Sequence, residues 1–532
     1  MTHPAGDDPR IPWVHARRLP EPTRRELTAR GLQIARVGAR YFAPLAFRQA
    51  RHLRHGPLPI DALARPLRRT FEELGGTYMK FGQLVASSPG IFGDAFAEEF
   101  RACLDTGPAV PYATVRDVVE ADLGMALDDA FASFDPVPIG KASIAVVHRA
   151  TLHDGRDVAV KVLRPAIEHG VAVDLALLQP LLELIARQTG DQAAGTLLQL
   201  FAGFRVQIGE ELDLRNEARA LAAFRLLLGE IDLPRLVVPE SFPELSGPNV
   251  LTMSYLDGVA IDDLAGAARF GIDPAPLVEE VVRAFFLTAV RWGAFHGDVH
   301  AGNMLLLRDG RLGIIDWGIV GRLDLESHHF FVRLLEAALG DESAWGDIAA
   351  HLTRTYGPAM QQGLGLSDDE LARFVRSLTE PVLLRPFGEV SLGALIQAPQ
   401  IQAAKAQGIE ATNRSLLALI GRFKAQRRLR RLADESGGTA SEFDRATFLL
   451  GKQLMYFERY GKMFLADVPL LHDREFFESL VASAPDVGPG SPFVEGGGAD
   501  HSAVMRGTEG ALTAERQGKR SPQGRSRGPS AS

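Results

Sequence analysis

The chain has 532 residues, of which 46% are hydrophobic and 23% charged, an ordinary balance for a globular protein with a large core. A net charge of −8 provides no general attraction to nucleic acid, so no nucleic-acid partner is expected. The single cysteine, Cys103, excludes internal disulfides and cysteine-rich zinc sites, which favours a cytoplasmic location. No apolar stretch approaches the roughly 18 residues that span a bilayer, so any membrane contact is expected to be peripheral, at the inner face.

Lysine is scarce in this chain. Eight of the 58 basic residues are lysines and the other fifty are arginines. Because the compact ammonium of lysine cannot be imitated by the planar guanidinium of arginine, each lysine is more informative than usual.

The N-terminal part predicts a helical extension over 26–108, after a disordered segment at 1–25. Arg30 to Arg54 mixes apolar residues with arginines, which predicts an amphipathic helix interrupted near Pro44. That helix is expected to pack on the protein, with docking on anionic lipid as the alternative. Residues 66–104 also look helical and contain the segment Lys80-Phe81-Gly82-Gln83.

Around residue 109 the pattern changes to a mixed α/β region, expected to extend to 258. Strand-forming runs at 144–151 and 157–163 flank Asp154-Gly155, a typical hairpin turn. The second run contains Val-Ala-Val-Lys161, a strand lysine suited to the α- and β-phosphates of a nucleotide. The preceding loop could direct backbone N–H groups at phosphate oxygens; it consists of Gly140, Lys141, Ala142 and Ser143.

Residues 196–228 predict one long helix that carries Glu211, Asp213 and Glu217. At about 100° per residue, Glu217 lies about 120° around the helix from Glu211. One helix can therefore present Glu217 to Lys161 and Glu211 to a different partner.

A buried strand at 250–254 leads into Tyr255-Leu256-Asp257-Gly258, which predicts a hinge. The backbone there could hydrogen-bond an adenine edge, with Ser254 and Leu256 as the contact residues. Residues 259–480 are expected to be mostly helical, with a disordered tail at 481–532. The basic run Arg422 to Arg431 is predicted to be a solvated helix face.

The most informative segment is 296–318, HGDVHAGNMLLLRDGRLGIIDWG. Asp298 is followed five positions later by Asn303, and a hairpin around Asp309-Gly310 would return the chain to Asp316. Asn303 and Asp316 could hold Mg²⁺ on a nucleotide's phosphates while Asp298 orients an acceptor hydroxyl or water.

Together these segments resemble the UbiB/AarF family of atypical kinases over roughly Leu63 to Glu342. The resemblance implies an α+β, bilobal protein-kinase-like fold that binds ATP and Mg²⁺. It implies that the helix with Lys80 and Gln83 lies over the active site and faces Glu211 of the Glu-x-Asp motif, which ends at Asp213. It also implies that Glu217 pairs with Lys161.

The resemblance further implies an ATPase or small-molecule kinase that supports isoprenoid quinone biosynthesis, with a quinone precursor or lipid as partner. The loop departs from the family's consecutive alanines, so Lys141 is expected to reach a phosphate. Val146 and Ala301 are further departures.

Two other functions remain open. The first is a phosphotransferase of the aminoglycoside- or choline-kinase type, against which the KFGQ and Glu-x-Asp segments argue. The second is a nucleotide-gated scaffold without turnover. A conventional protein kinase ranks last.

Overall fold

The computed structural model describes residues 17–51, 60–86, 94–103, 107, 109–189, 191–231, 233–356, 365–391 and 445–485. The basic run at Arg422–Arg431 and most of the two segments expected to be disordered lie outside these residues. The described part of the first segment, residues 17–25, is held on the protein. The Arg17 backbone N–H donates to the carbonyl of Gly209, and its guanidinium donates to the carbonyl of Leu212 at 3.0 Å. The expectation of disorder is therefore wrong for this stretch.

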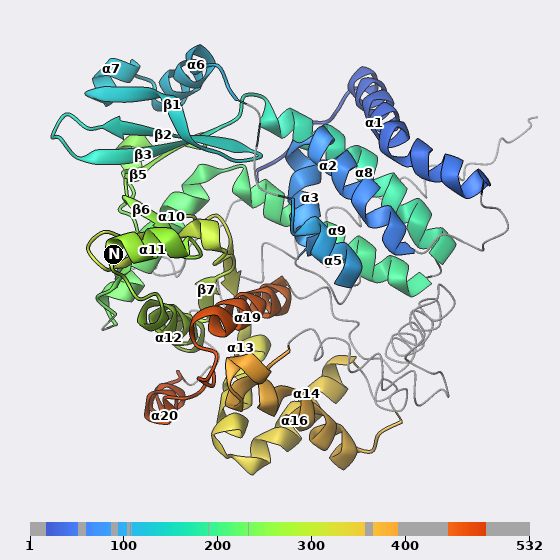
Figure 1. Ribbon diagram of the computed structural model, residues 1–532, viewed down its shortest axis with the longest axis vertical. Coiled ribbons are helices and arrows are strands. Elements are labelled where there is room, and N and C mark those ends of the chain that lie inside the picture. The colour runs from blue at the N-terminus through green and yellow to red at the C-terminus, as the bar shows by residue number, and fades with distance from the viewer. Residues whose placement is uncertain are drawn as a thin grey trace, which may run out of the picture.

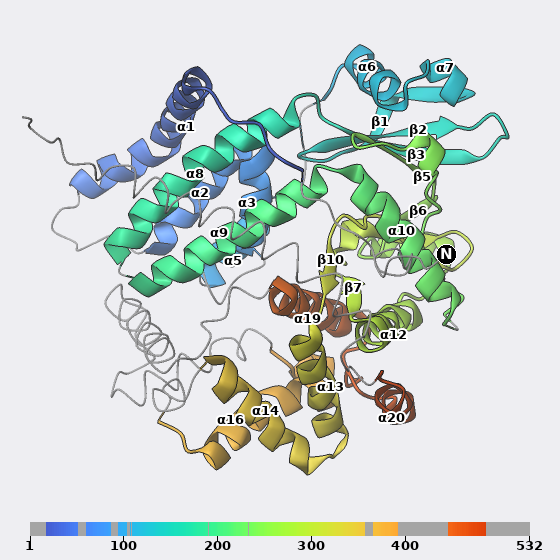
Figure 2. The same cartoon turned by 180° about the vertical axis from the view of Figure 1, so that it is seen from behind.

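The N-terminal helices stack against two long helices of the following region (Figures 1 and 2). The N-terminal helices are α1 (Arg24–Arg51), η1 (Ile60–Leu63), α2 (Ala64–Leu74), α3 (Gly76–Ala86) and α5 (Asp94–Phe100). The two long helices are α8 (Ile167–Thr189) and α9 (Asp191–Glu211). The helical stretch expected at 66–104 is divided, because Gly75 and Gly76 adopt positive φ angles of 67° and 48° that favour glycine. Helix α1 packs on the protein as expected but runs through Pro44, where the interruption was predicted. An interior proline removes one backbone hydrogen bond and crowds the carbonyl four residues earlier, yet the 28-residue helix continues past it.

The lobe at the top of Figure 1, called the upper lobe, contains a four-stranded antiparallel sheet in the order β1-β2-β3-β5. Its elements are α6 (Tyr112–Leu123), α7 (Leu127–Ala130), β1 (Ser133–Lys141), β2 (Ala145–Thr151), β3 (Asp157–Leu163), α10 (Leu214–Gly229), η2 (Pro243–Leu245) and β5 (Val250–Ser254). The predicted hairpin is confirmed, with Gly155 at φ 89°. Val158 and Val160 of β3 pack toward α6, whereas Ala159 packs toward α10. Since side chains alternate along a strand, Lys161 is on the α10 side.

The helix predicted over 196–228 is two helices. Helix α9 ends at Glu211, and α10 begins at Leu214. Between them Asp213 is extended (φ −121°, ψ 97°), and its carboxylate accepts the N–H of Arg215 as an N-cap. Aspartate competes well for this position, and the helical periodicity does not reveal the break.

The lower lobe is mainly helical and shares one core with the sheet face that packs on α10. Its elements are β4 (Leu236–Val237), β6 (Gly258–Ala260), α11 (Leu264–Phe270), α12 (Ala275–Trp292), β7 (Ala294–His296), η3 (Ala301–Asn303), β8 (Met304–Leu307), β9 (Leu312–Ile314), β10 (Val320–Arg322), α13 (Leu325–Leu339), α14 (Glu342–Tyr356), α16 (Asp368–Leu384), η4 (Phe387–Glu389), α19 (Arg445–Phe464) and α20 (Arg474–Ala482). The predicted β8–β9 hairpin is confirmed, with Gly310 at φ 85°. The protein therefore has the expected α+β architecture with two lobes and an N-terminal helical extension.

Candidate active site

Lys161 lies between two carboxylates at the junction of the lobes. Its Nζ donates to Glu217 at 2.8 and 3.0 Å and to Asp316 Oδ2 at 3.1 Å. Burial lowers the pKa of Lys161, but the charges of Asp316 and Glu217 outweigh it, so the lysine stays charged. The predicted pairing of Lys161 with Glu217 is thus present, and Asp316 joins it.

The two carboxylates differ in their environment. Glu217 is 3% exposed, and burial raises its pKa to about 7 despite the charge of Lys161. The Asp316 side chain is 41% exposed. Burial acts to raise the pKa of Asp316, but Lys161 and Lys80 together with the N–H of Gly318 hold it well below its usual range. Asp316 is therefore the ionised carboxylate of the pair, as a ligand for a cation must be.

The His296 side chain links the backbone of Asp298 to the backbone of Asp316, at the end of the β8–β9 hairpin. His296 Nε2 donates to the carbonyl of Asp316 at 2.6 Å, and its Nδ1 accepts the N–H of Asp298 at 3.0 Å. Burial lowers the pKa of His296 to about 4, so the neutral ring with one donor and one acceptor makes both bonds. This histidine therefore holds Asp298 and Asp316 at the same end of the hairpin.

Asn303 and Asp316 have the oxygens that Mg²⁺ needs. The side-chain amide nitrogen of Asn303 donates to the carbonyl of Asp298 at 3.0 Å, so Oδ1 is the side-chain atom that could bind a metal. Among the described residues no cluster of three His, Cys, Asp or Glu side chains could hold a metal by itself. In nucleotide sites Mg²⁺ is commonly held by one or two protein ligands together with phosphate oxygens and water, so Asn303 and Asp316 could be sufficient.

The loop between β1 and β2 has its backbone partly engaged. The N–H of Ala142 donates to the carbonyl of Ala145 at 2.9 Å, and the Ala142 carbonyl accepts from the Arg164 guanidinium. Lys141 is exposed, whereas Ser143 is 3% exposed. The Ala142 amide is therefore not available to a phosphate in this conformation.

The predicted hinge follows β5. The N–H of Ser254 donates to the carbonyl of Glu240, and its hydroxyl accepts the N–H of Glu240 at 3.0 Å. Leu256 packs close to Gly313. A Cβ atom added to Gly313 would lie 2.6 Å from Cδ1 of Leu256. The hinge thus contacts the β8–β9 hairpin directly.

Helix α3 brings Lys80 to the acids of the site. Lys80 Nζ lies 2.9 Å from Glu211 Oε2, and its charge also acts to lower the pKa values of Asp298 and Asp316. Gln83 is on the same helix, close to one turn further on. Asp213 does not join this contact, because its carboxylate caps α10 and binds Arg215 at 2.5 Å.

Two residues of helix α19 reach the candidate site, and sequence reasoning missed both. Lys452 Nζ lies 2.8 Å from Asp298 Oδ1, and the Tyr456 hydroxyl donates to the same oxygen at 3.1 Å. Burial acts to raise the pKa of Asp298, but the charge of Lys452 is the largest of several opposing effects, and the pKa is lowered. The scarcity of lysine was the one signal that could have drawn attention to Lys452.

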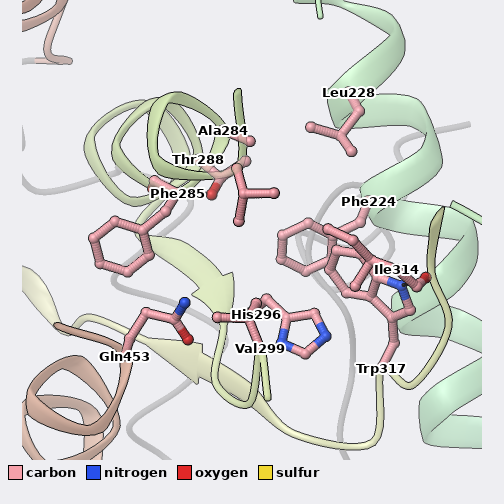
Figure 3. A pocket seen from close by; sticks show the side chains of 11 residues that line it. Phe224, Leu228, Ala284, Phe285, Thr288, His296, Val299, Ile314, Trp317 and Gln453 are labelled. Atoms are coloured by element: carbon pink, nitrogen blue, oxygen red, sulfur yellow. Dashed lines mark hydrogen bonds between the residues drawn. The ribbon is translucent and has the colours of Figure 1, made fainter. Parts of the chain in front are cut away.

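A cavity lies behind Trp317 of the Asp-Trp-Gly segment (Figure 3). The Phe224 ring packs against the Trp317 ring at a tilt of 34°, with centroids 4.3 Å apart. The Trp317 indole donates to the carbonyl of Ile314 at 2.8 Å. Gln453 of α19 points into this cavity, is 1% exposed, and makes no side-chain hydrogen bond within the described part of the chain. The cavity is otherwise mostly apolar, so this amide is buried at a cost in free energy.

Comparison with known proteins identifies the family. The model of the ABC1 atypical kinase-like domain matches residues 103–345. The chain belongs to the UbiB/aarF family of ABC1 atypical kinase-like proteins. An uncharacterized protein of Mycobacterium tuberculosis is 31% identical over 82% of this chain and 80% of its own length. An uncharacterized chloroplastic aarF domain-containing protein kinase of Arabidopsis thaliana is 29% identical over 77% of this chain and 73% of its own.

A further family member is a probable protein kinase UbiB of Xylella fastidiosa, 31% identical over 62% of this chain and 60% of its own length. A solved structure of a Mycobacterium tuberculosis protein with erythromycin is 24% identical and covers 76% of this chain and 98% of that chain. Its TM-score of 0.41 is too low to support an argument. Within the described residues, no helix is long and apolar enough to span a membrane.

Proposed function

We propose that the protein transfers the γ-phosphoryl group of Mg-ATP to water or to a small molecule, in support of isoprenoid quinone or other lipid metabolism. The observation that carries the chemistry is the contact of one buried lysine, Lys161, with both Glu217 and Asp316. This contact joins the sheet of the upper lobe to the Asp-Trp-Gly segment of the lower lobe. Membership of an atypical kinase family supports the same chemistry.

Each residue then has a role that its surroundings suit. Lys161, oriented by Glu217, would bind the α- and β-phosphates. Asn303 and Asp316 would hold Mg²⁺, which when bound would neutralise charge on the phosphates. Asp298 would orient the acceptor. The nucleotide would be covered by the end of β1, at Gly140 and Lys141, and by the loop residues Ala142 and Ser143, with the Ala142 amide remaining bonded to Ala145. The hinge at Ser254 and Leu256 would bound it on the other side.

The position of α3 supports a small acceptor. Lys80 pairs with Glu211, and its charge acts to lower the pKa values of Asp298 and Asp316. These two observations support a position of α3 over the mouth of the site. A folded protein substrate would have to displace α3. We therefore assign Lys80, Gln83, Glu211 and Asp213 to a gate that admits water or a small molecule.

The surface of α1 supports a peripheral contact with lipid. On this helix Leu32 is 68% exposed and Phe47 is 60% exposed, so both apolar side chains are accessible to a lipid surface. The exposed arginines Arg25 and Arg36 lie on the same helix and would attract anionic headgroups.

The test is hydrolysis of Mg-ATP by the full chain, measured with and without anionic liposomes and a quinone-head-group phenol. Turnover that is lost in Lys161→Met and in Asp316→Asn, with both variants still folded, would support the chemistry. Turnover unchanged in both variants would refute it. Stimulation by liposomes or the phenol would support the role in lipid metabolism, and no effect of either would count against that part alone.

A further inference from the structure

Helix α19 lies at the centre of the molecule, although it comes about a hundred residues after the segment matched by the family model ends at 345. In Figures 1 and 2 it runs beside α12, and it also packs against β10 and η4. Two of its side chains, Lys452 and Tyr456, are four residues apart and therefore project from the same face. Both meet the side chain of Asp298.

The two contacts fall on one oxygen of the carboxylate. The closest approach of Lys452 Nζ to the carboxylate is 2.8 Å, to Oδ1, and the Tyr456 hydroxyl donates to the same oxygen at 3.1 Å. The contacts are well sheltered, since the Lys452 side chain is 11% exposed and that of Asp298 is 19% exposed. A carboxylate held by two donors on one oxygen has its rotation fixed and presents the other oxygen in one direction.

We propose that Lys452 and Tyr456 are positioning residues that hold Asp298 through Oδ1 and leave Oδ2 to accept the proton of the phosphoryl acceptor. This inference rests on the proposed function. In the reaction, the acceptor oxygen forms a bond to the γ-phosphorus while the bond from that phosphorus to the leaving ADP oxygen breaks. The acceptor's proton passes to Oδ2 of Asp298.

The choice of residue type supports this role. Three of the chain's eight lysines, Lys80, Lys161 and Lys452, contact the acids of this one site. Most of the other positive charges of the chain are arginines. A lysine at 452 brings one compact charge to one oxygen, whereas an arginine fork tends to engage both oxygens of a carboxylate.

The position of α19 does not depend on these two contacts. The Phe457 ring packs edge-on against Phe285 with centroids 5.1 Å apart, and Phe457 and Tyr460 are each 1% exposed. The Tyr460 hydroxyl donates to the carbonyl of Val299, the residue after Asp298, at 3.0 Å. The apolar face therefore anchors the helix, and substitutions at 452 and 456 can test positioning without releasing it.

The experiment is steady-state hydrolysis of Mg-ATP by the full chain and its variants, with thermal unfolding measured alongside. Lys452→Met is expected to lower kcat by roughly 100-fold, the lower range for loss of a well-placed general base, with KM for Mg-ATP changed by less than about threefold. Tyr456→Phe, which removes only the hydroxyl, is expected to lower kcat by about fivefold. The double variant should lose less than the product of the two effects, because both groups act on the same oxygen.

Two further variants separate positioning from a structural role. Lys452→Arg keeps a donor and a charge, but its fork can also reach Oδ2, so it should recover kcat only in part, to within about tenfold of the wild type. Lys462→Met is the matched control, because Lys462 is on the same helix but pairs with Glu458 at the surface. It should leave kcat and KM unchanged.

An unchanged kcat in Lys452→Met would overturn the inference while leaving the proposed function standing. So would a loss that appears mainly as a raised KM, since Lys452 would then bind nucleotide rather than position Asp298. A loss in Lys452→Met that tracks a fall in Tm and is not recovered in Lys452→Arg would assign a structural role. Absence of turnover in the wild type would refute the proposed function and this inference with it.

Discussion

Replacing Lys161 with methionine removes the positive charge that balances two carboxylates. Methionine retains an unbranched apolar stem, so the change is mainly one of charge. Removing one partner of a buried pair costs about 3–5 kcal/mol in the free energy of unfolding. Since Glu217 is 3% exposed but the Asp316 side chain is 41% exposed, only one carboxylate is deprived of both its partner and water. We therefore expect the lower end of this range, about 3 kcal/mol, near pH 8.

The loss should depend on pH in a defined direction. Burial raises the pKa of Glu217 to about 7 even with Lys161 present, against an ordinary value of 4.5. Without Lys161 the pKa rises further, because the lysine acts to lower it. A group whose pKa is raised in the folded state contributes stability that is lost as pH rises through that pKa. The deficit of Lys161→Met should thus be smaller near pH 5.5, where Glu217 is protonated, than near pH 8.

Urea unfolding followed by circular dichroism at the two pH values measures this difference. The double variant Lys161→Met/Glu217→Gln should recover much of the stability near pH 8, because the neutral amide removes the unpaired buried charge. Lys462→Met, a surface lysine on α19, is the control for loss of a charge that is not enclosed. A variant Lys161→Met as stable as the wild type near pH 8, or a deficit that grows as pH falls, would refute the reasoning.

Three other substitutions follow from the contacts. Gln453→Met is expected to raise the free energy of unfolding by about 1–2 kcal/mol. The buried amide has no side-chain hydrogen-bond partner among the described residues, and methionine replaces it with an apolar side chain of similar length. A fall in Tm would contradict this. Arg30→Met should cost about 3 kcal/mol, because Asp174, 3% exposed, loses the guanidinium that binds it at 2.7 Å; adding Asp174→Asn should restore stability, and a double variant no better than the single one would exclude this cause. Lys80→Met should tighten binding of Mg²⁺-nucleotide, measured by calorimetry, because a cation near Asp316 competes with the metal; weaker binding would show that Lys80 contacts the nucleotide instead.

The parts of the site that follow from local sequence were predictable. Asp154-Gly155 and Asp309-Gly310 identify their hairpins because each turn needs a positive φ that glycine allows. The hairpins in turn locate Lys161 on β3 and Asp316 beside Asp298.

Features set by tertiary contacts were not predictable in the same way. The break at Asp213 depends on a single cap within an otherwise helical stretch, so the periodicity of 196–228 continues across it. Lys452 and Tyr456 meet Asp298 across more than 150 residues of chain, and nothing in the sequence around 452 records that contact. Lys80 and Glu211 are also far apart in the sequence, and their pairing was expected only from the family resemblance.

The contact of Lys452 with Asp298 also has a consequence for biosynthesis. Ribosomes deliver the chain from its N-terminus, so Asp298 emerges well before the lysine that balances its charge. Until residues 445–464 emerge and α19 packs on the lower lobe, this carboxylate has neither of its α19 partners. A nascent chain can thus form much of both lobes while the candidate site is still incomplete. Nonsense or frameshift products that end before 452 would keep the family domain at 103–345 but lack both α19 partners of Asp298.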